Sequence, residues 1–172
     1  QDVDGLATVN LSGNGNVAGV GNLAEDATPA IFNDVTTFDA SGLEGTLDIN
    51  LLGDAGAPPL ADRNITFTGA QDDTSLVIGQ GNNTVNFQGG DDLLVLSSTG
   101  FNGNDSVDGG AGNDSLEIHF NDTISAAAGG VLPNGTTPNG LDDASDGVVQ
   151  AINNATNVEN LIVDVWTQTT ED

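Results

Sequence analysis

A nine-residue period in the middle of the chain constrains the fold more than any other feature. Residues 109–117, GGAGNDSLE, repeat residues 100–108, GFNGNDSVD, at glycine, asparagine, aspartate, serine and aliphatic positions. If four residues, Leu96 to Thr99, are left out, the same frame continues back to residue 69 and gives five units. The eighth position of every unit is then aliphatic. Such a short, fixed period predicts a repeat architecture in which each unit adds one strand to a shared core.

Each unit combines a polar turn with a short strand. Glycine stands at the fourth position of four units and permits the left-handed backbone of a tight turn. Asp or Asn stands at the sixth position of the same four units, and the strand that follows places one aliphatic side chain in the core. Because two units make one coil, turns two units apart stack on the same side. We therefore predict that Asp92 faces Asp114 and that Asn83 faces Asp105.

The two units from 100 to 117 resemble the repeats-in-toxin (RTX) nonapeptide, Gly-Gly-x-Gly-x-Asp-aliphatic, and the three earlier units are degenerate. The resemblance covers about 50 of the 172 residues. It implies an all-β chain that forms a right-handed parallel β-solenoid, or β-roll, around Ca²⁺. Two flanking segments, DASGLEGTLDINL at 39–51 and NVENLIV at 157–163, resemble segments that accompany such repeats in bacterial surface-layer and related secreted proteins.

The composition agrees with oxygen ligands for a hard cation. The 26 acidic residues include 21 Asp, and there are 20 Asn, so carboxylate and amide oxygens are abundant. The candidate calcium ligands are the acidic, amide and glycine residues of the repeats: Asp114, Asp105, Asp92, Asn83, Asp108, Asn113, Asn104, Asp91, Gly112, Gly110, Gly103 and Gly90. The alternative is a solenoid whose Asn-Gly and Asp-Gly turns hold no ion. For Asn82, Asn83, Asp72 and Asp73 the two interpretations are about equally supported.

A net charge of −25, with Arg63 as the only Lys or Arg, excludes several classes of function. Nucleic-acid phosphates and anionic membranes are bound by Lys and Arg, and this surface would repel both. Without cysteine the chain forms neither disulfides nor zinc-thiolate sites. It contains no apolar run long enough for a membrane helix. Residues 1–4 carry no export signal, so secretion would use a signal that has been removed or lies elsewhere.

The chain is predicted to form one β-solenoid domain. Residues 1–59 would supply N-terminal strands, residues 60–117 the repeat coils, and residues 118–172 a loop and a C-terminal strand. More finely, we expect strands at 35–51 and 157–165, a hairpin or further coil at 1–22, a strand without a metal loop at 60–68, and a long loop near 124–156 that includes a short helix at 146–154.

Two further features predict contacts of the solenoid surface. Residues 93–96, Leu-Leu-Val-Leu, are apolar in both phases of a strand, which predicts burial on both faces under the N-terminal part of the chain or under another subunit. Neither end of the chain shows an obvious polar cap, and an uncapped coil presents unpaired strand edges. We therefore expect copies of the chain to assemble head to tail.

The chain is expected not to be an enzyme. His119 is the only histidine and has no interpretable partner spacing, and the glycine runs lack a phosphate-binding signature. A calcium-dependent polysaccharide lyase that uses Arg63 is the best enzymatic alternative, but there is no second cation to stabilise an intermediate. Neighbouring carboxylates such as Asp91 and Asp92 more often bind metal than hydrolyse glycosides.

The function expected from the sequence is that of a secreted, extracellular, calcium-binding structural protein. It would assemble with copies of itself into a filament or a surface-layer lattice. The alternative is an adhesin or glycan-binding module of a larger surface protein, with a cell-surface glycan as its partner. A single module should stay monomeric with calcium, whereas an assembly subunit should polymerise.

Overall fold

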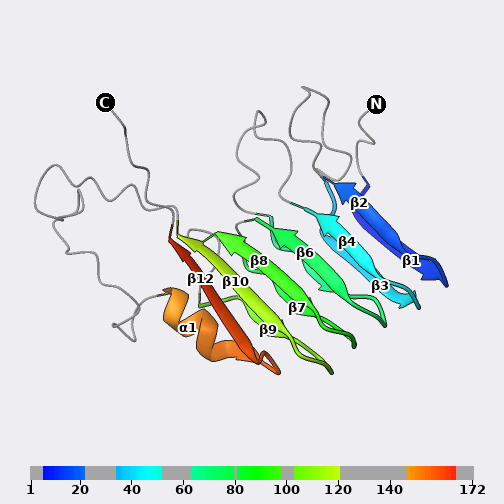
Figure 1. The fold of residues 1–172 in the computed structure, drawn as a ribbon. Helices are drawn as coiled ribbons and strands as arrows, with labels where there is room; N and C mark the ends of the chain where they lie inside the picture. Colours follow the sequence, from blue (N-terminus) through cyan, green and yellow to red (C-terminus); the bar gives the residue numbers. More distant parts are fainter. Residues whose placement is uncertain are drawn as a thin grey trace, which may run out of the picture.

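Two parallel β-sheets of six strands each make up the fold in the computed structural model (Figure 1). The structure describes residues 6–21, 34–51, 63–79, 81–97, 103–120 and 147–165. Sheet A consists, in spatial order, of β1 (Thr8–Gly13), β3 (Thr37–Leu43), β5 (Thr66–Thr68), β7 (Thr84–Asn86), β9 (Ser106–Asp108) and β11 (Ala155–Thr156). Sheet B consists of β2 (Val17–Gly21), β4 (Leu47–Asn50), β6 (Thr74–Ile78), β8 (Leu93–Ser97), β10 (Ser115–Phe120) and β12 (Asn160–Val165).

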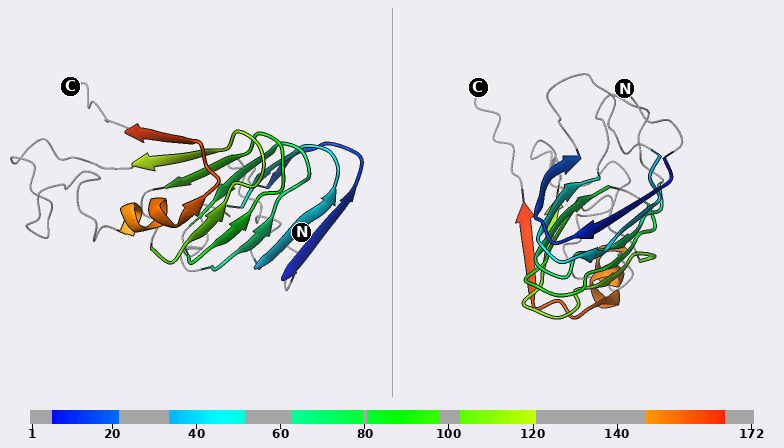
Figure 2. Two further views of the ribbon diagram at one scale, coloured as in Figure 1. Left: turned by 90° about the horizontal axis from the view of Figure 1, so that it is seen from below. Right: turned by 90° about the vertical axis from the view of Figure 1, so that its right-hand side faces the viewer.

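Each odd-numbered strand and the even-numbered strand that follows it form one coil of a β-solenoid. The coils stack in parallel from β1 and β2 at one end to β11 and β12 at the other (Figure 2). Thr66 pairs with Thr84 and Leu76 with Leu94, each 18 residues further along the chain. Two nine-residue units therefore make one coil, and the predicted parallel β-solenoid is confirmed.

The four-residue insertion lies further along the chain than the repeat frame places it. In the next coil Leu94 pairs with Leu116, 22 residues on. Leu96 and Ser97 remain in register with β10 as part of β8. The insertion therefore follows Ser97, and the predicted interval Leu96 to Thr99 begins too early.

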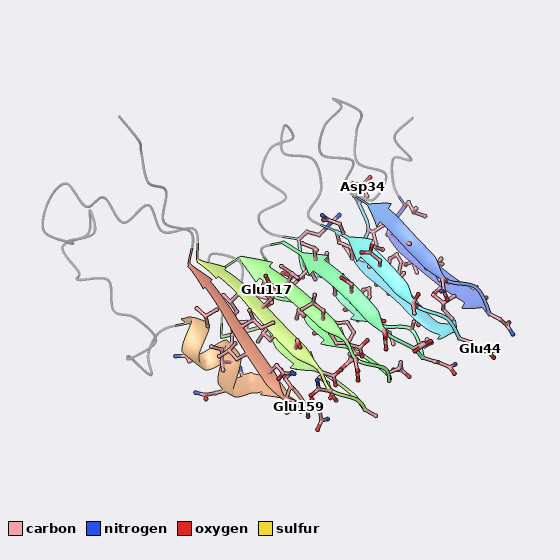
Figure 3. All side chains as sticks on the ribbon, in the orientation of Figure 1. Asp34, Glu44, Glu117 and Glu159 are labelled. Carbon is pink, nitrogen blue, oxygen red and sulfur yellow. The ribbon has the colours of Figure 1, made fainter. Side chains whose placement is uncertain are left out.

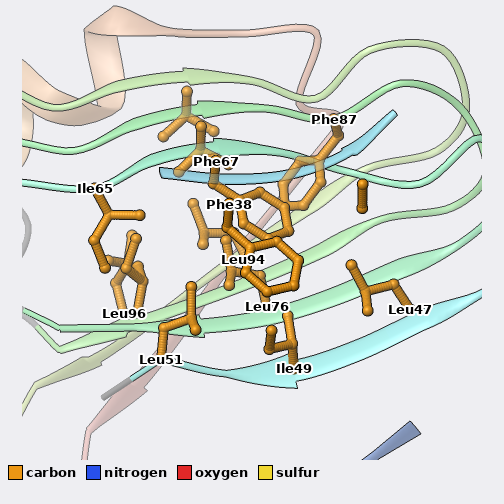
Figure 4. Packing of buried hydrophobic residues seen from close by; sticks show 14 of the residues in the cluster. Phe38, Leu47, Ile49, Leu51, Ile65, Phe67, Leu76, Phe87, Leu94 and Leu96 are labelled. Carbon is orange, nitrogen blue, oxygen red and sulfur yellow. The ribbon is translucent and has the colours of Figure 1, made fainter. Parts of the chain in front are cut away.

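The core lies between the two sheets (Figure 4). The eighth-position leucines of β6, β8 and β10 are at most 1% exposed. Phe67 stacks on Phe38 with ring centroids 5.5 Å apart, and it meets Phe87 edge to face at 6.0 Å. These three rings come from successive coils and join them into one apolar column.

The N-terminal residues form a further coil and not a hairpin. β1 pairs with β3 and β2 with β4, so β1 and β2 lie in different sheets. The strands predicted at 35–51 are β3 and β4, the strand predicted at 60–68 is β5, and the strand predicted at 157–165 is β12.

Within the single chain, residues 93–96 are buried on one face only. Leu94 and Leu96 face the core, whereas Leu93 and Val95 lie half-buried on the outer face of sheet B. The N-terminal strands β1 and β2 stand at the far end of the sheets, where they extend the stack and do not cover β8. The described N-terminal strands therefore do not cover this face, and cover by another subunit stays a prediction.

Helix α1 (Gly147–Asn154) covers part of the C-terminal end of the solenoid. It lies beside β9 and β11 (Figures 1 and 2) and buries Ala151 against the core. Its Asn154 Nδ2 donates to the carbonyl oxygen of Gly103 at 3.0 Å. Helix α1 thus packs on the preceding coil, and the expected absence of a polar cap stays a prediction.

Helix α1 is the helix predicted at 146–154, and the loop predicted before it, residues 124–146, lies outside the described residues. None of the helices in the described ranges is long and apolar enough to cross a membrane.

Candidate metal centre

The turns of the solenoid stack along two opposite edges. The short-turn edge contains the turns that lead from sheet A to sheet B, namely residues 14–16, 44–46, 69–73, 87–92, 109–114 and 157–159. The long-loop edge contains the described residues that precede strands of sheet A, among them Gly79, residues 81–83 and residues 103–105. Glu44 and Glu159 lie at the short-turn edge and Asp34 at the long-loop edge (Figure 3).

The twelve candidate ligands divide between these edges. Eight lie at or beside two stacked turns of the short-turn edge: Gly90, Asp91, Asp92, Asp108, Gly110, Gly112, Asn113 and Asp114. Four lie at the long-loop edge: Asn83, Gly103, Asn104 and Asp105. The structure thus brings together two separate groups and not one.

Glycine allows neighbouring turns of the short-turn edge to approach each other closely. Gly90 has φ +100° and Gly112 has φ +154°, values that other residues rarely adopt. A Cβ atom on Gly112 would collide with the carbonyl oxygen of Gly90 in the preceding coil. The fourth-position glycines are therefore required by the stacking itself.

A ladder of acceptor side chains runs along the inner side of this edge. Each accepts a hydrogen bond from a main-chain N–H of the preceding coil. Asp92 Oδ1 accepts from Thr74 at 2.6 Å, Asp114 Oδ1 from Asp92 at 2.8 Å, and Glu159 Oε2 from Asp114 at 2.8 Å. Asp92 and Asp114 are each 2% exposed. The predicted pairing of Asp92 with Asp114 is confirmed.

A second, exposed ladder lies outside the first. Asp91 donates its N–H to Asp73 Oδ1 at 2.7 Å, and Asn113 donates its N–H to Asp91 Oδ1 at 3.0 Å. Asp108 Oδ1 accepts both from Gly110 N of its own turn and from Asn157 Nδ2 of the next coil. These residues hold the turns in register, and water reaches the exposed carboxylates of Asp73 and Asp91.

The two buried aspartates of the short-turn edge, Asp92 and Asp114, each have one oxygen without a hydrogen-bond partner. Oδ2 of Asp92 and Oδ2 of Asp114 are both buried and unpaired, although buried polar atoms are almost always satisfied. Asp114 Oδ2 faces Gly109, where an added Cβ would lie 2.8 Å from this oxygen and would collide with the carbonyl oxygen of Asn157. A carboxylate oxygen and a carbonyl oxygen therefore both lie close to Gly109. These are the ligand types that Ca²⁺ prefers.

Burial makes both carboxyl groups costly to ionise. Desolvation is the main cause that raises the pKa of Asp92 from 3.8 to about 7, and the charges of Asp114 and Asp73 add to it against the hydrogen bond from Thr74. Desolvation also raises the pKa of Asp114, and the charge of Glu159 adds to that rise. A cation between the coils would favour the ionised form of both groups.

Neither Lys nor Arg neutralises the short-turn edge. Arg63, the only residue of either type, follows β4 at the opposite edge, where its Nη2 donates to the carbonyl oxygen of Leu51 at 2.8 Å and burial lowers its pKa. Among the residues that the structure describes, no three acidic or histidine side chains converge as a metal centre. A cation at this edge would therefore need main-chain carbonyl oxygens in addition to carboxylates.

The raised pKa of Asp92 predicts an unusual pH dependence for the cation-free protein. The unfolded chain loses this proton near pH 3.8 and the folded chain near pH 7, so the folded state binds more protons between these values. The free energy of unfolding should then fall as pH rises from about 4 to 7. In chelator, thermal melts should show a higher midpoint at pH 5 than at pH 8.

The variant Asp92→Asn is the control for the effect of the other carboxylates on the pH dependence of the melting midpoint. Protonation of the other carboxylates acts on both proteins, so the difference between wild type and Asp92→Asn isolates this group. Melting midpoints that depend on pH equally in both proteins would contradict the assignment.

The long-loop edge has the same ladder. Asp105 Oδ1 accepts from Asn83 N at 2.7 Å, and Asn83 Oδ1 accepts from Ile65 N at 3.1 Å, so the predicted pairing of Asn83 with Asp105 is confirmed. Asn83 is 2% exposed, and its Nδ2 donates to the carbonyl oxygens of Gly79 and Gly81 at 3.3 and 3.4 Å. Both polar atoms of this buried side chain are therefore hydrogen-bonded.

The sequence analysis did not include Asn157 and Glu159 among the candidate residues, although both bond to the turn of the preceding coil. Residues 157–161 have the spacing of residues 112–116, and Leu161 pairs with Leu116. Asn157 adopts φ +52°, a conformation that Asn tolerates better than most residues. Because Asn stands for Gly and Glu for Asp, only the spacing signals that this segment continues the repeat.

Comparison of the chain with protein-family models, with curated proteins and with solved structures finds no match. Support for a function therefore comes from the stacked turns themselves and from the repeat pattern that builds them.

Proposed function

We propose that the chain is a calcium-stabilised β-solenoid of the RTX type that serves as a secreted, extracellular structural subunit. The observation that carries this proposal is the pair of buried, unpaired carboxylate oxygens, Oδ2 of Asp92 and Oδ2 of Asp114, in adjacent coils. A buried carboxylate oxygen without a protein donor needs a proton, a bound water or a cation, and only the proton and the cation also remove its charge. Above pH 7 the proton on Asp92 is lost, and a cation would then offset the buried charge.

The ligand set favours calcium over other ions. Ca²⁺ accepts carboxylate and main-chain carbonyl oxygens in variable number, whereas Mg²⁺ requires nearly octahedral geometry and transition metals prefer His or Cys ligands. Asp92 and Asp114 would hold the ion between coils, with the carbonyl oxygen of Asn157 as a further ligand beside Gly109. Extracellular modules bind calcium with dissociation constants of roughly 10⁻⁴ to 10⁻³ M, so the fold would be stabilised outside the cell.

The C-terminal end of sheet B supports assembly with a second copy of the chain. Leu161 and Val163 of β12 occupy the core positions that Leu116 and Ile118 fill in β10. Leu161 is 45% and Val163 39% exposed, whereas Leu116 and Ile118 are at most 1% exposed. Strand β12 thus presents apolar core positions on an end strand, an arrangement that promotes pairing with another sheet.

The N-terminal end offers a matching surface. Val9 and Val17 occupy the positions of Phe38 and Leu47 in the next coil, but they are only half-buried. A second copy that placed its β2 beside β12 would continue sheet B in the same strand order. Repetition of this contact would build a filament by head-to-tail addition.

Electron microscopy of the chain in millimolar calcium, and again after chelation, tests this function. We expect filaments or sheets in calcium that disappear when the ion is removed, together with a loss of β-sheet circular dichroism. Folded monomers under both conditions would contradict both calcium dependence and assembly, and they would favour the glycan-binding alternative.

A single charge on β12 should prevent assembly without unfolding the chain. Leu161→Lys places an ammonium group on the exposed core face of the end strand, where a second copy would have to bury it at a cost of several kcal/mol. Ile162→Lys, with the same change on the outer face of the same strand, is the matched control. Filaments formed by Leu161→Lys as readily as by wild type would exclude this end as the contact.

A further inference from the structure

Asn83 and Asp92 occupy the same position of consecutive repeat units, on opposite edges of the solenoid. Both side chains are 2% exposed. Both use Oδ1 to accept a main-chain N–H of the preceding coil, from Ile65 and from Thr74 respectively. The two side chains differ only in the second atom, which is the donor Nδ2 in Asn83 and the acceptor Oδ2 in Asp92.

The second atom determines how each turn is held. Asn83 Nδ2 donates to the carbonyl oxygens of Gly79 and Gly81 within its own turn. The orientation of this amide is fixed, because the N–H of Ile65 requires an oxygen opposite it. At Asp92 the corresponding atom is an oxygen without a hydrogen-bond partner. Because one acceptor cannot bond to another, Asp92 cannot hydrogen-bond to carbonyl oxygens of its own turn as Asn83 does.

The next turn of the long-loop edge is also held by an amide. Gly103 occupies the same repeat position as Gly81, and its carbonyl oxygen accepts from Asn154 Nδ2 of helix α1 at 3.0 Å. Gly103 also lies against Gln150, because an added Cβ would come within 2.5 Å of its Oε1. Side-chain amides therefore reach glycine carbonyl oxygens in two successive turns of this edge.

We infer that the amide group of Asn83 takes the place of a bound calcium ion, so that the turn at residues 79–83 is held without metal and the calcium sites lie on the short-turn edge. This inference rests on the proposed calcium function. It would take Asn83 out of the ligand set that the sequence predicts. The physical reason is that a donor and a cation satisfy the same carbonyl oxygens, and one excludes the other.

Exchange of the two residue types tests the inference. Asn83→Asp replaces the donor with an acceptor, so the variant should bind one more calcium ion per chain in isothermal titration calorimetry. In chelator its melting midpoint should fall by about 5 °C, and calcium should restore it. Asn82→Asp adds the same charge at the exposed neighbouring position and should change neither the calcium count nor the midpoint by more than about 1 °C.

The reverse exchange, Asp92→Asn, does not depend on whether Asn83→Asp folds. It should bind one calcium ion fewer than wild type, and in chelator its midpoint should be about 5 °C higher, because the new amide can donate to carbonyl oxygens of its own turn. Equal calcium counts for wild type, Asn83→Asp and Asn82→Asp would overturn the inference, as would a chelator midpoint of Asp92→Asn no higher than that of wild type. Absence of calcium binding by wild type would instead overturn the proposed function, and the inference with it.

Discussion

Removal of calcium is expected to lower the melting midpoint of the chain by about 10–20 °C and to weaken its β-sheet circular dichroism. At free calcium about 100 times the dissociation constant, each occupied site contributes about 2.7 kcal/mol to stability. Two sites would then supply about 5 kcal/mol, a large share of the 5–15 kcal/mol typical of a domain. For a chain of this size each kcal/mol corresponds to about 2–4 °C.

The effect should be this large because the carboxylates that would bind calcium are buried, and burying their charge without a cation lowers the stability of the folded chain. Asp92 and Asp114 are 2% exposed and lie in adjacent coils, so without a cation the folded chain must either hold protons or bury charge. Thermal melts at pH 8 in calcium and in chelator measure the difference, and magnesium at the same concentration is the control. A midpoint that responds equally to both ions would indicate general charge screening and contradict a specific site.

Replacement of Phe67 with Ala is expected to reduce the free energy of unfolding by about 3–5 kcal/mol in calcium. Phe67 is 0% exposed and its ring lies between those of Phe38 and Phe87 (Figure 4). Its removal would leave a cavity where three coils meet, and the surrounding strands are held by their ladders and cannot close it.

Urea denaturation followed by circular dichroism measures this loss. Thr66→Ala changes the exposed neighbour in the same strand and should alter stability by no more than about 0.5 kcal/mol. Similar midpoints for both variants would show that the aromatic column contributes little to stability.

The repeat frame predicts much of the fold because two structural demands recur every nine residues. An aliphatic side chain must enter the core at the eighth position, and glycine must allow the close approach seen between Gly112 and Gly90. From these two requirements the repeat frame predicts the order of β5 to β10 and the pairing of Asp92 with Asp114. Asn157 and Glu159 occupy repeat positions that hold glycine and aspartate in other units. The structural repeat therefore continues there although the residues differ from the pattern.

The remaining features depend on contacts between distant residues. Helix α1 contacts the preceding coil through Asn154 and Gly103, which are 51 residues apart, and no local pattern encodes that contact. The apolar outer residues Leu93 and Val95 predict a cover by the N-terminal part of the chain or by another subunit, and the pattern of residues does not distinguish the two. Likewise, the repeat treats Asn83 and Asp92 alike, and only the hydrogen bonds of their second side-chain atoms separate them.

A crystal structure of the chain grown in millimolar calcium, with anomalous difference density for the ion, tests the central claim most directly. The account predicts calcium at roughly 2.3–2.6 Å from Oδ2 of Asp92 and of Asp114, and no ion beside the amide of Asn83. Turns 87–92 and 109–114 stacked as described but free of calcium, with water or a proton at both carboxylate oxygens, would contradict it.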